Sequence, residues 1–336
     1  MALVINDTTY AGTVASYFWL PATFGMDTLQ KGGVYVQDGI KKQHTISRID
    51  FARPLQKRQA TPTGSGTFTI DGRVLVPQDV MLYTEFNPRD FETQWLAESL
   101  SPTLLARELP VTAENYMMQI GLERALEQIE NGLWMGSLSY TADPGSDGNG
   151  QICFFDGFLK KMLADSAVQK VASPLPLVST VSVTSTSTNV LEAMDKLITL
   201  CVVNKKALMS RPNRFKRLKF FMSIGTEQLY QAASINLTFK GQLTQSGETQ
   251  PWKGFQVVAL AGIPDNTILF AEGLDDVSSN LYLGMNSTED NNLQLQRLQN
   301  NSELFFLKGL MKYDTQYGFS EEIFLYTTLT SATFTA

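Results

Sequence analysis

The stretch from Lys31 to Arg58 reads KGGVYVQDGIKKQHTISRIDFARPLQKR and is basic and rich in turn residues. Its seven cations are balanced only by Asp38 and Asp50, so the stretch has a local net charge of +5. Strand-like runs alternate here with Gly-Gly and Asp-Gly pairs, which predicts an extended projection. A two-stranded ribbon alone is marginally stable in water. We therefore expect the projection to lie on a neighbouring molecule or on the body of its own chain.

The same projection is expected to continue as far as residue 84. Two runs of alternating apolar residues flank Asp71-Gly72, and Asp-Gly in such a setting is a strong hairpin signal. Residues 57–66 contain a proline and two glycines and are expected to form the tip. The sequence thus predicts a turn at Asp71-Gly72 within an extended loop.

Residues 113–134, AENYMMQIGLERALEQIENGLW, carry a helical pattern. The apolar residues that recur at helical spacing are Met118, Leu122, Ala125, Leu126, Ile129 and Leu133. At about 1.5 Å per residue, this helix would be roughly 33 Å long. We expect it to span residues 112–135, and we expect Glu123, Glu127 and Glu130 to lie on a solvated face.

The rest of the chain mixes helices and strands. A polar loop is expected at residues 136–150, and Asn189 is a plausible cap for a second amphipathic helix. Further elements are predicted as helices at 155–164, 190–203 and 226–233 and strands at 218–223, 255–261, 267–271, 304–313 and 319–326. Helices and antiparallel strands are interspersed without strict alternation, which is typical of the α+β class.

Composition predicts a globular chain with a sizeable core. Of its 336 residues, 43% are hydrophobic, which favours two or three structural units. A net charge of −6 argues against a protein whose whole surface binds nucleic acid, but it allows local basic patches. Arg211–Lys219 is a second basic run, whereas Asp265–Asp290 has six acids and no Lys or Arg. Such opposite runs suit subunits that recognise copies of themselves, and they are also typical of solvated surface.

Residues that carry catalysis or bind metal are sparse. The single histidine, His44, lies in the projection with neither cysteine near it in sequence, which does not fit a Ser-His-Asp or Cys-His arrangement. His44, Cys153 and Cys201 are too few and too scattered in sequence to form a zinc site. Two thiols in a chain of this length provide no disulfide framework, and they favour synthesis in a reducing compartment. We expect no catalytic residue, metal or cofactor, although the 33 acids leave a carboxylate pair for glycoside hydrolysis open.

No segment predicts insertion into a membrane. Residues 1–10 lack the charged region and apolar core of a signal peptide. Val171–Leu191 is uncharged, but two prolines and nine Ser or Thr residues exclude it as a membrane-spanning helix. No membrane partner is therefore expected.

Several short motifs follow the long helix in a particular order. They are Asp156-Gly-Phe-Leu159, Tyr230-Gln-Ala-Ala233, Trp252-Lys-Gly-Phe-Gln-Val-Val258, Gly262-Ile-Pro-Asp-Asn-Thr-Ile268 and Asn280-Leu-Tyr-Leu-Gly-Met-Asn286. Together with the projection and the helix, this order resembles the major capsid proteins of tailed bacteriophages with the Hong Kong ninety-seven-like fold. Asn87-Pro-Arg-Asp-Phe-Glu-Thr-Gln-Trp95 in particular resembles capsid proteins of phages that infect Bacteroidetes-like bacteria.

The resemblance implies a division of the chain into the parts of that fold. The correspondence is an amino-terminal arm at 1–32, an extended β-ribbon loop at 33–84, a peripheral domain at 85–174 with its spine helix at 112–135, an axial domain at 175–260 and a return to the peripheral domain at 261–336. No charged, scaffolding-like helical stretch precedes the arm. We therefore expect either that scaffolding is a separate protein or that the numbering used here begins at the amino terminus of the mature protein.

The resemblance also implies a structural protein and not an enzyme. Copies would form hexamers and pentamers of an icosahedral head shell around the double-stranded DNA of a tailed phage. The implied partners are other copies of the chain, portal, scaffolding and head-decoration proteins, and double-stranded DNA that is bound non-specifically. The protein would be assembled in the bacterial host cytoplasm and become part of the virion.

Each ribbon would lie across an adjacent subunit. Contacts between subunits are expected from Lys41, Lys42, Arg48, Arg53, Lys57 and Arg58 to acids of a neighbour such as Glu123, Glu127 and Asp275. Some members of the family join subunits by a Lys-to-Asn isopeptide bond, and the spacing here does not single out a lysine for it.

Three other functions stay open at this point. An encapsulin-like compartment would have the same fold but enclose a cargo enzyme. An acid-based hydrolase is a second alternative. A monomeric adhesin or tail component, suggested by the Ser- and Thr-rich strands, is the third.

Overall fold

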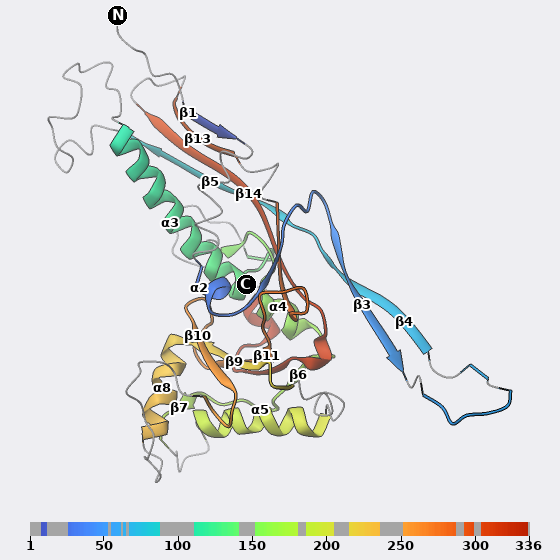
Figure 1. The fold of residues 1–336 in the computed structure, drawn as a ribbon. Helices are drawn as coiled ribbons and strands as arrows, with labels where there is room; N and C mark the ends of the chain where they lie inside the picture. The colour runs from blue at the N-terminus through green and yellow to red at the C-terminus, as the bar shows by residue number, and fades with distance from the viewer. Residues whose placement is uncertain are drawn as a thin grey trace, which may run out of the picture.

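The structure is a computed structural model that describes residues 8–11, 26–52, 55–61, 63–64, 67–87, 111–140, 152–180, 186–204, 215–235, 251–286, 292–298 and 304–334. Two sheets and the helices beside them form a body, and a two-stranded ribbon projects from it (Figure 1). Helices and mainly antiparallel strands are interspersed along the chain, so the predicted α+β class is confirmed.

The larger sheet in the described part of the chain has six strands. Five of them follow the order β1 (Thr8–Ala11), β13 (Asn292–Arg297), β14 (Phe305–Tyr317), β12 (Leu281–Met285) and β2 (Tyr35–Gln37). The sixth strand, β5 (Gln78–Phe86), also pairs with β14. The long strand β14 holds the sheet together, because its first half pairs with both β13 and β5 and its last part pairs with β12.

Helix α3 (Val111–Met135) runs along one face of this sheet (Figure 1) and confirms the predicted spine helix within one residue. Leu122, Ile129 and Leu133 are buried against the sheet, as their spacing predicts. The helix approaches β14 closely at Gly121, where a Cβ atom would lie 2.7 Å from the Leu307 side chain.

Glu130 corrects the expectation that all three glutamates of this helix are solvated. It is 6% exposed, and its carboxylate accepts hydrogen bonds from the backbone nitrogen of Thr28 at 3.2 Å and from the Thr28 hydroxyl. The Trp134 indole also donates to that hydroxyl at 2.8 Å. Sequence spacing missed this role because the partner lies 102 positions away.

Helix α2 (Asp27–Gln30) is the element that these contacts hold. Met26 and Leu29 are buried in the same core cluster as Leu133. Met26, Thr28 and Leu29, which the sequence assigned to an arm, are therefore buried in the body of their own chain, whereas Gln30 and Lys31 are exposed. Of the residues before them, β1 pairs with β13 of the same chain.

The smaller sheet has the order β10 (Gln256–Leu260), β9 (Leu218–Ser223), β11 (Thr267–Glu272), β15 (Phe324–Thr327) and β6 (Gln169–Lys170). It lies between two hydrophobic clusters. On β9, Phe220 packs in the cluster with α5 (Val190–Asn204) and α8 (Ile224–Ile235), whereas Phe221 packs in the cluster with α3. Alternate side chains of this buried strand thus join the two halves of the body.

Shorter elements complete the body. They are α4 (Phe158–Ala164), the paired strands β7 (Leu177–Val178) and β8 (Thr188–Asn189), and the 3-10 helices η4 (Ser320–Glu322) and η5 (Ser331–Phe334). The Asn189 side chain accepts a hydrogen bond from the Leu191 amide at 2.8 Å, which confirms its predicted role as a cap of α5.

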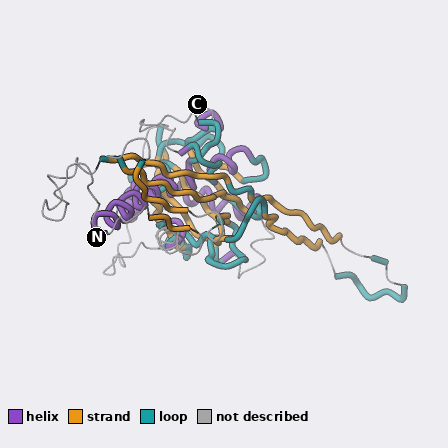
Figure 2. The backbone as a smooth tube through the Cα atoms, turned by 90° about the horizontal axis from the view of Figure 1, so that it is seen from above, coloured by secondary structure: helices purple, strands orange, loops and turns teal. Residues whose placement is uncertain are grey.

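The ribbon consists of β3 (His44–Ala52) and β4 (Thr67–Leu75), paired antiparallel along their whole length. Figure 2 shows it extending away from the body. The hairpin turn predicted at Asp71-Gly72 is wrong, because both residues lie inside β4 and Gly72 pairs with Ser47. A Cβ atom on Gly72 would lie 2.8 Å from the Ile46 carbonyl oxygen, so the glycine allows close approach of two strands.

Candidate assembly interface

The ribbon exposes apolar side chains that nothing on its own chain covers in the described structure. Ile70 is 67% exposed and Val74 is 41% exposed, and both occupy alternate positions on the same face of β4. Gly72 lies between them on this face, and its backbone pairs with that of Ser47. Exposed apolar side chains on one face of a projecting ribbon are typical of a surface that binds another molecule.

The tip carries an exposed apolar residue beside two cations. Leu55 is 91% exposed, and Lys57 and Arg58 are exposed too. Neither cation forms an ion pair with any residue that the structure describes. The Gln56 side chain donates a hydrogen bond to the Thr63 carbonyl oxygen at 3.1 Å across the loop, which limits the freedom of the tip before it binds anything.

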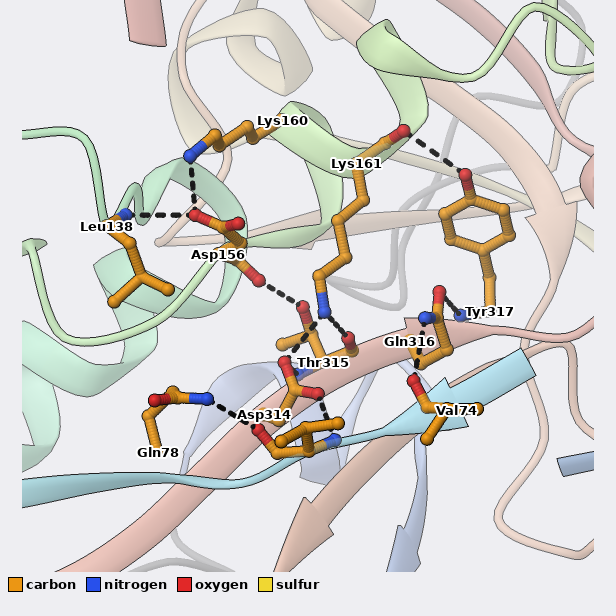
Figure 3. A network of polar contacts seen from close by, with 11 residues as sticks. Val74, Gln78, Leu138, Asp156, Lys160, Lys161, Asp314, Thr315, Gln316 and Tyr317 are labelled. Carbon is orange, nitrogen blue, oxygen red and sulfur yellow. Dashed lines mark hydrogen bonds and ion pairs between the residues drawn. The ribbon is translucent and has the colours of Figure 1, made fainter. Parts of the chain in front are cut away.

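The base of the ribbon is fixed to the body by a polar network around Asp314 (Figure 3). One oxygen of this buried carboxylate accepts a hydrogen bond from the Val76 backbone nitrogen at 2.8 Å, and the other pairs with the Lys161 ammonium at 2.7 Å. The Gln316 side chain donates to the Val74 carbonyl oxygen at 3.1 Å. Burial raises the pKa of Asp314, although Lys161 opposes that shift. Strand β14 thereby holds the chain where β4 ends.

A second contact at the base joins Arg73 of the ribbon to Asp165 just after α4. Their guanidinium and carboxylate groups are 2.5 Å apart, and the Arg73 guanidinium lies 4.4 Å from the centre of the Tyr317 ring. Partial burial opposes ionisation of Asp165, but hydrogen bonds from the Ala167 amide, Arg73 and Tyr317 outweigh it and lower the pKa of Asp165. The direction of the ribbon is therefore set by charged contacts on two body elements.

The structure is similar to solved capsid structures over nearly its whole length. One chain of the satellite phage P4 procapsid including size determination (Sid) protein matches with a TM-score of 0.58 at 9% identity, over 94% of this chain and 100% of that chain. Capsid chains of a native and an empty GTA particle match with TM-scores of 0.52 and 0.50 at 12% and 13% identity, each over 90% of both chains. This chain has the fold of tailed-phage capsid proteins. Neither a protein-family model nor a curated protein matches its sequence.

This capsid fold confirms the Hong Kong ninety-seven-like class that the order of segments predicted. The resemblance to phages of Bacteroidetes-like bacteria is untested, and all but the first residue of Asn87–Trp95 lie outside the described residues. The division into arm, extended loop, peripheral domain and axial domain also stays a prediction.

The predicted cationic contact residues of the ribbon are all placed by the structure except one. Lys41 and Lys42 are exposed before β3 begins, and Lys57 and Arg58 are exposed at the tip. The backbone of Arg48 lies in β3 opposite Asp71, and Arg53 falls outside the described residues.

The predicted acidic contact residues are all exposed on the body. Glu123 and Glu127 lie on α3, and Asp275 lies in the loop between β11 and β12. Glu127 already pairs with Arg124 at 2.7 Å, where both side chains are more than half exposed. Asp275 is the acid of the three that borders a hollow.

The described residues form neither a metal centre nor a membrane-spanning helix. They contain no group of His, Cys, Asp and Glu side chains that could hold a metal ion, and His44 is exposed on the ribbon. None of the helices in the described ranges has both the length and the apolar character needed to cross a membrane.

Sequence reasoning found the charged residues of the ribbon but missed those that anchor it. Asp314 contacts residues 153 and 238 positions away, and Arg73 contacts a residue 92 positions away. A lone Asp or Arg within an alternating run gives no local signal for such a partner.

Proposed function

We propose that this chain is the major capsid protein of a tailed bacteriophage and self-assembles into the icosahedral head shell around double-stranded DNA. The observation that carries the proposal is the ribbon, which extends beyond the body with exposed apolar and cationic side chains in a chain of capsid fold. The role is structural and not catalytic.

A projecting ribbon favours repeated contacts of one kind. Each copy has a ribbon on one part of its surface and a body that can receive the ribbon of the next copy. Such head-to-tail contacts generate closed rings when the rotation between copies closes, as in the hexamers and pentamers of a shell. Burial of an arm and a ribbon between copies would give interfaces in the obligate range of roughly 2,000 to 5,000 Å².

The contacts in these rings use opposite charges. Lys57 and Arg58 at the tip, together with Lys41, Lys42, Arg48 and Arg53, face acids of the adjacent copy among Glu123, Glu127 and Asp275. Rim charges of this kind set orientation and partner choice more than affinity.

Other partners follow from the role of a head shell. Portal, scaffolding and head-decoration proteins contact the shell, and packaged DNA contacts its inner surface without sequence preference. Assembly takes place in the cytoplasm of the bacterial host, and the product is the virion.

The test is assembly of the expressed chain and of two tip variants. Size-exclusion chromatography and negative-stain microscopy should show megadalton shells for the unaltered chain and for K57R/R58K, which keeps both charges. K57E/R58E should remain unassembled with an unchanged circular dichroism spectrum. Shells of normal yield from K57E/R58E would refute the role of the tip, and a small, discrete species from the unaltered chain would refute the shell.

The content of particles from infected or lysogenic cells separates the proposal from an encapsulin-like compartment. Nuclease-protected, double-stranded DNA is the expected content. A single enriched enzyme without DNA would favour the compartment instead.

A further inference from the structure

A hollow of about 380 Å³ opens on the body between α2, the start of β2 and the loop after β11. The residues that line it are Leu29, Gln30, Val34, Tyr35, Val36 and Asp275. Leu29 and Val34 are buried members of the main core cluster, so the floor is apolar and fixed by the packing of the body. A concave apolar site with a few polar groups is the usual form of a binding site.

The hollow is bordered by one acid, Asp275, and Asp276 follows it in the chain. Asp275 and Asp276 are exposed, and Asp275 forms no ion pair with a described residue. The Ser278 hydroxyl and amide donate hydrogen bonds to Asp276 and lower its pKa, which keeps it ionised near neutral pH. Two cations of the same chain lie near this loop. Arg217 contacts Glu272 at 3.7 Å and Ser278 at 3.4 Å and attracts Asp276 electrostatically, and Lys219 attracts Asp275 in the same way. Neither cation forms an ion pair with Asp275 or Asp276 among the described residues, so both exposed carboxylates can still pair with cations of another molecule.

The ribbon tip has the complementary composition. It presents one highly exposed leucine followed two and three positions later by Lys57 and Arg58, and no acid occurs between residues 51 and 70. An apolar side chain followed by two cations matches an apolar hollow that is bordered by Asp275, with Asp276 next to it in sequence.

A chain cannot fill its own hollow with its own tip. The ribbon extends away from the body (Figures 1 and 2), whereas α2 lies in the body (Figure 1) and β2 pairs with β12 of the larger sheet. The occupant must come from another molecule. Since every copy carries one tip and one hollow, a second copy of this chain satisfies both.

The alternative acids are less suited to receive the tip. Glu127 is already paired with Arg124. Glu123 lies four residues before it on the same helix, and neither residue lines the hollow described above. A contact on α3 would leave Leu55 without an apolar site.

We propose that the ribbon tip of one copy docks in this hollow of a second copy, with Leu55 inside it and with Lys57 and Arg58 against Asp275 and Asp276. The docking rests on the proposed shell and specifies which surface of the neighbour receives the tip. It selects Asp275, rather than Glu123 or Glu127, as the acid that receives the tip.

Disulfide trapping in assembled particles tests the docking. In a Cys153→Ser background, L55C/Q30C places one thiol on the tip and one at the mouth of the hollow, and L55C/E123C places the second thiol on α3. A disulfide requires Cα atoms within about 7 Å, so only residues in contact are joined. After oxidation, a non-reducing denaturing gel should show a ladder of multimers for L55C/Q30C and a monomer band for L55C/E123C, as for L55C alone.

The outcomes separate this docking from the shell itself. Particles without a ladder for L55C/Q30C, or with a ladder for L55C/E123C, would overturn the docking and leave the shell intact. Failure of the unaltered chain to form particles would overturn both. If the cysteine variants do not assemble, charge exchange decides: K57D/R58D should abolish particles, and D275K/D276K in the same chain should restore at least half of the yield. No restoration would overturn the docking.

Discussion

The Arg73→Met substitution tests whether the base contacts hold the ribbon in place. The Arg73 guanidinium forms a hydrogen bond with the Asp165 carboxylate at 2.5 Å and covers the Tyr317 ring at 4.4 Å, and its side chain is 32% exposed. A charge-assisted hydrogen bond contributes about 1.5 to 3 kcal/mol and a partly exposed cation–π contact about 0.5 to 1 kcal/mol. Solvent screening and the remaining bonds of Asp165 reduce the sum, so we expect a loss of about 2 kcal/mol.

This loss should appear in the ribbon before it appears in the whole body. A two-stranded ribbon depends on its anchor for stability, so weakening the base should increase local opening of β3 and β4. A cost of about 2 kcal/mol corresponds to a roughly 30-fold increase in the opening equilibrium. Hydrogen exchange of the unassembled chain should show that loss of protection for amides at residues 44–47 and 72–75.

A matched control is Arg124→Met, which breaks the exposed pair with Glu127 on α3. Exposed pairs contribute little, so its effect should stay below about 0.5 kcal/mol. Unchanged ribbon protection in Arg73→Met, or an equal effect of both substitutions, would refute the assignment of Arg73 as an anchor.

Three further substitutions test other parts of the account. Burial raises the pKa of Glu130 above its ordinary 4.5, so the folded state binds the proton more tightly than the unfolded state does. The unaltered protein should therefore lose stability relative to Glu130→Gln as pH rises from 4.5 through the raised pKa. Parallel pH dependence of the two proteins in urea unfolding would contradict this. Asp314→Asn leaves the partly buried Lys161 without its counter-charge and should lower the free energy of unfolding by about 2 to 3 kcal/mol, and a change below 1 kcal/mol would show that the pair is dispensable. Gly262→Ala places a Cβ atom 2.4 Å from the Glu130 carbonyl oxygen and should cost about 1 to 3 kcal/mol, whereas Gly64→Ala has no atom within 4 Å and should be neutral in the same assay.

Elements with a local pattern could be predicted from the sequence. The spacing of apolar residues in α3 and the capping residue before α5 are properties of neighbouring positions, and both elements were placed within one residue. Strand β9 was predicted with the bounds that it has. The order of such elements was enough to indicate the capsid fold, although no single motif was specific.

Features that depend on distant partners could not be predicted. Asp71-Gly72 has the composition of a turn, but pairing with β3 over the full length of β4 keeps it extended. Glu130 follows the spacing of two exposed glutamates, yet the buried amide of Thr28 recruits it as a hydrogen-bond acceptor. The hollow likewise combines residues 29–36 with Asp275, which lies far away in the sequence.

The central claim is that the projecting ribbon becomes buried on sister molecules in a closed shell. Electron cryo-microscopy of the particle formed by the expressed chain tests it most directly, because it locates residues 44–75 of every copy. We predict a shell of hexamers and pentamers in which each ribbon lies on the body of an adjacent copy. A ribbon folded back on its own body, in a species that remains a single chain, would contradict the account.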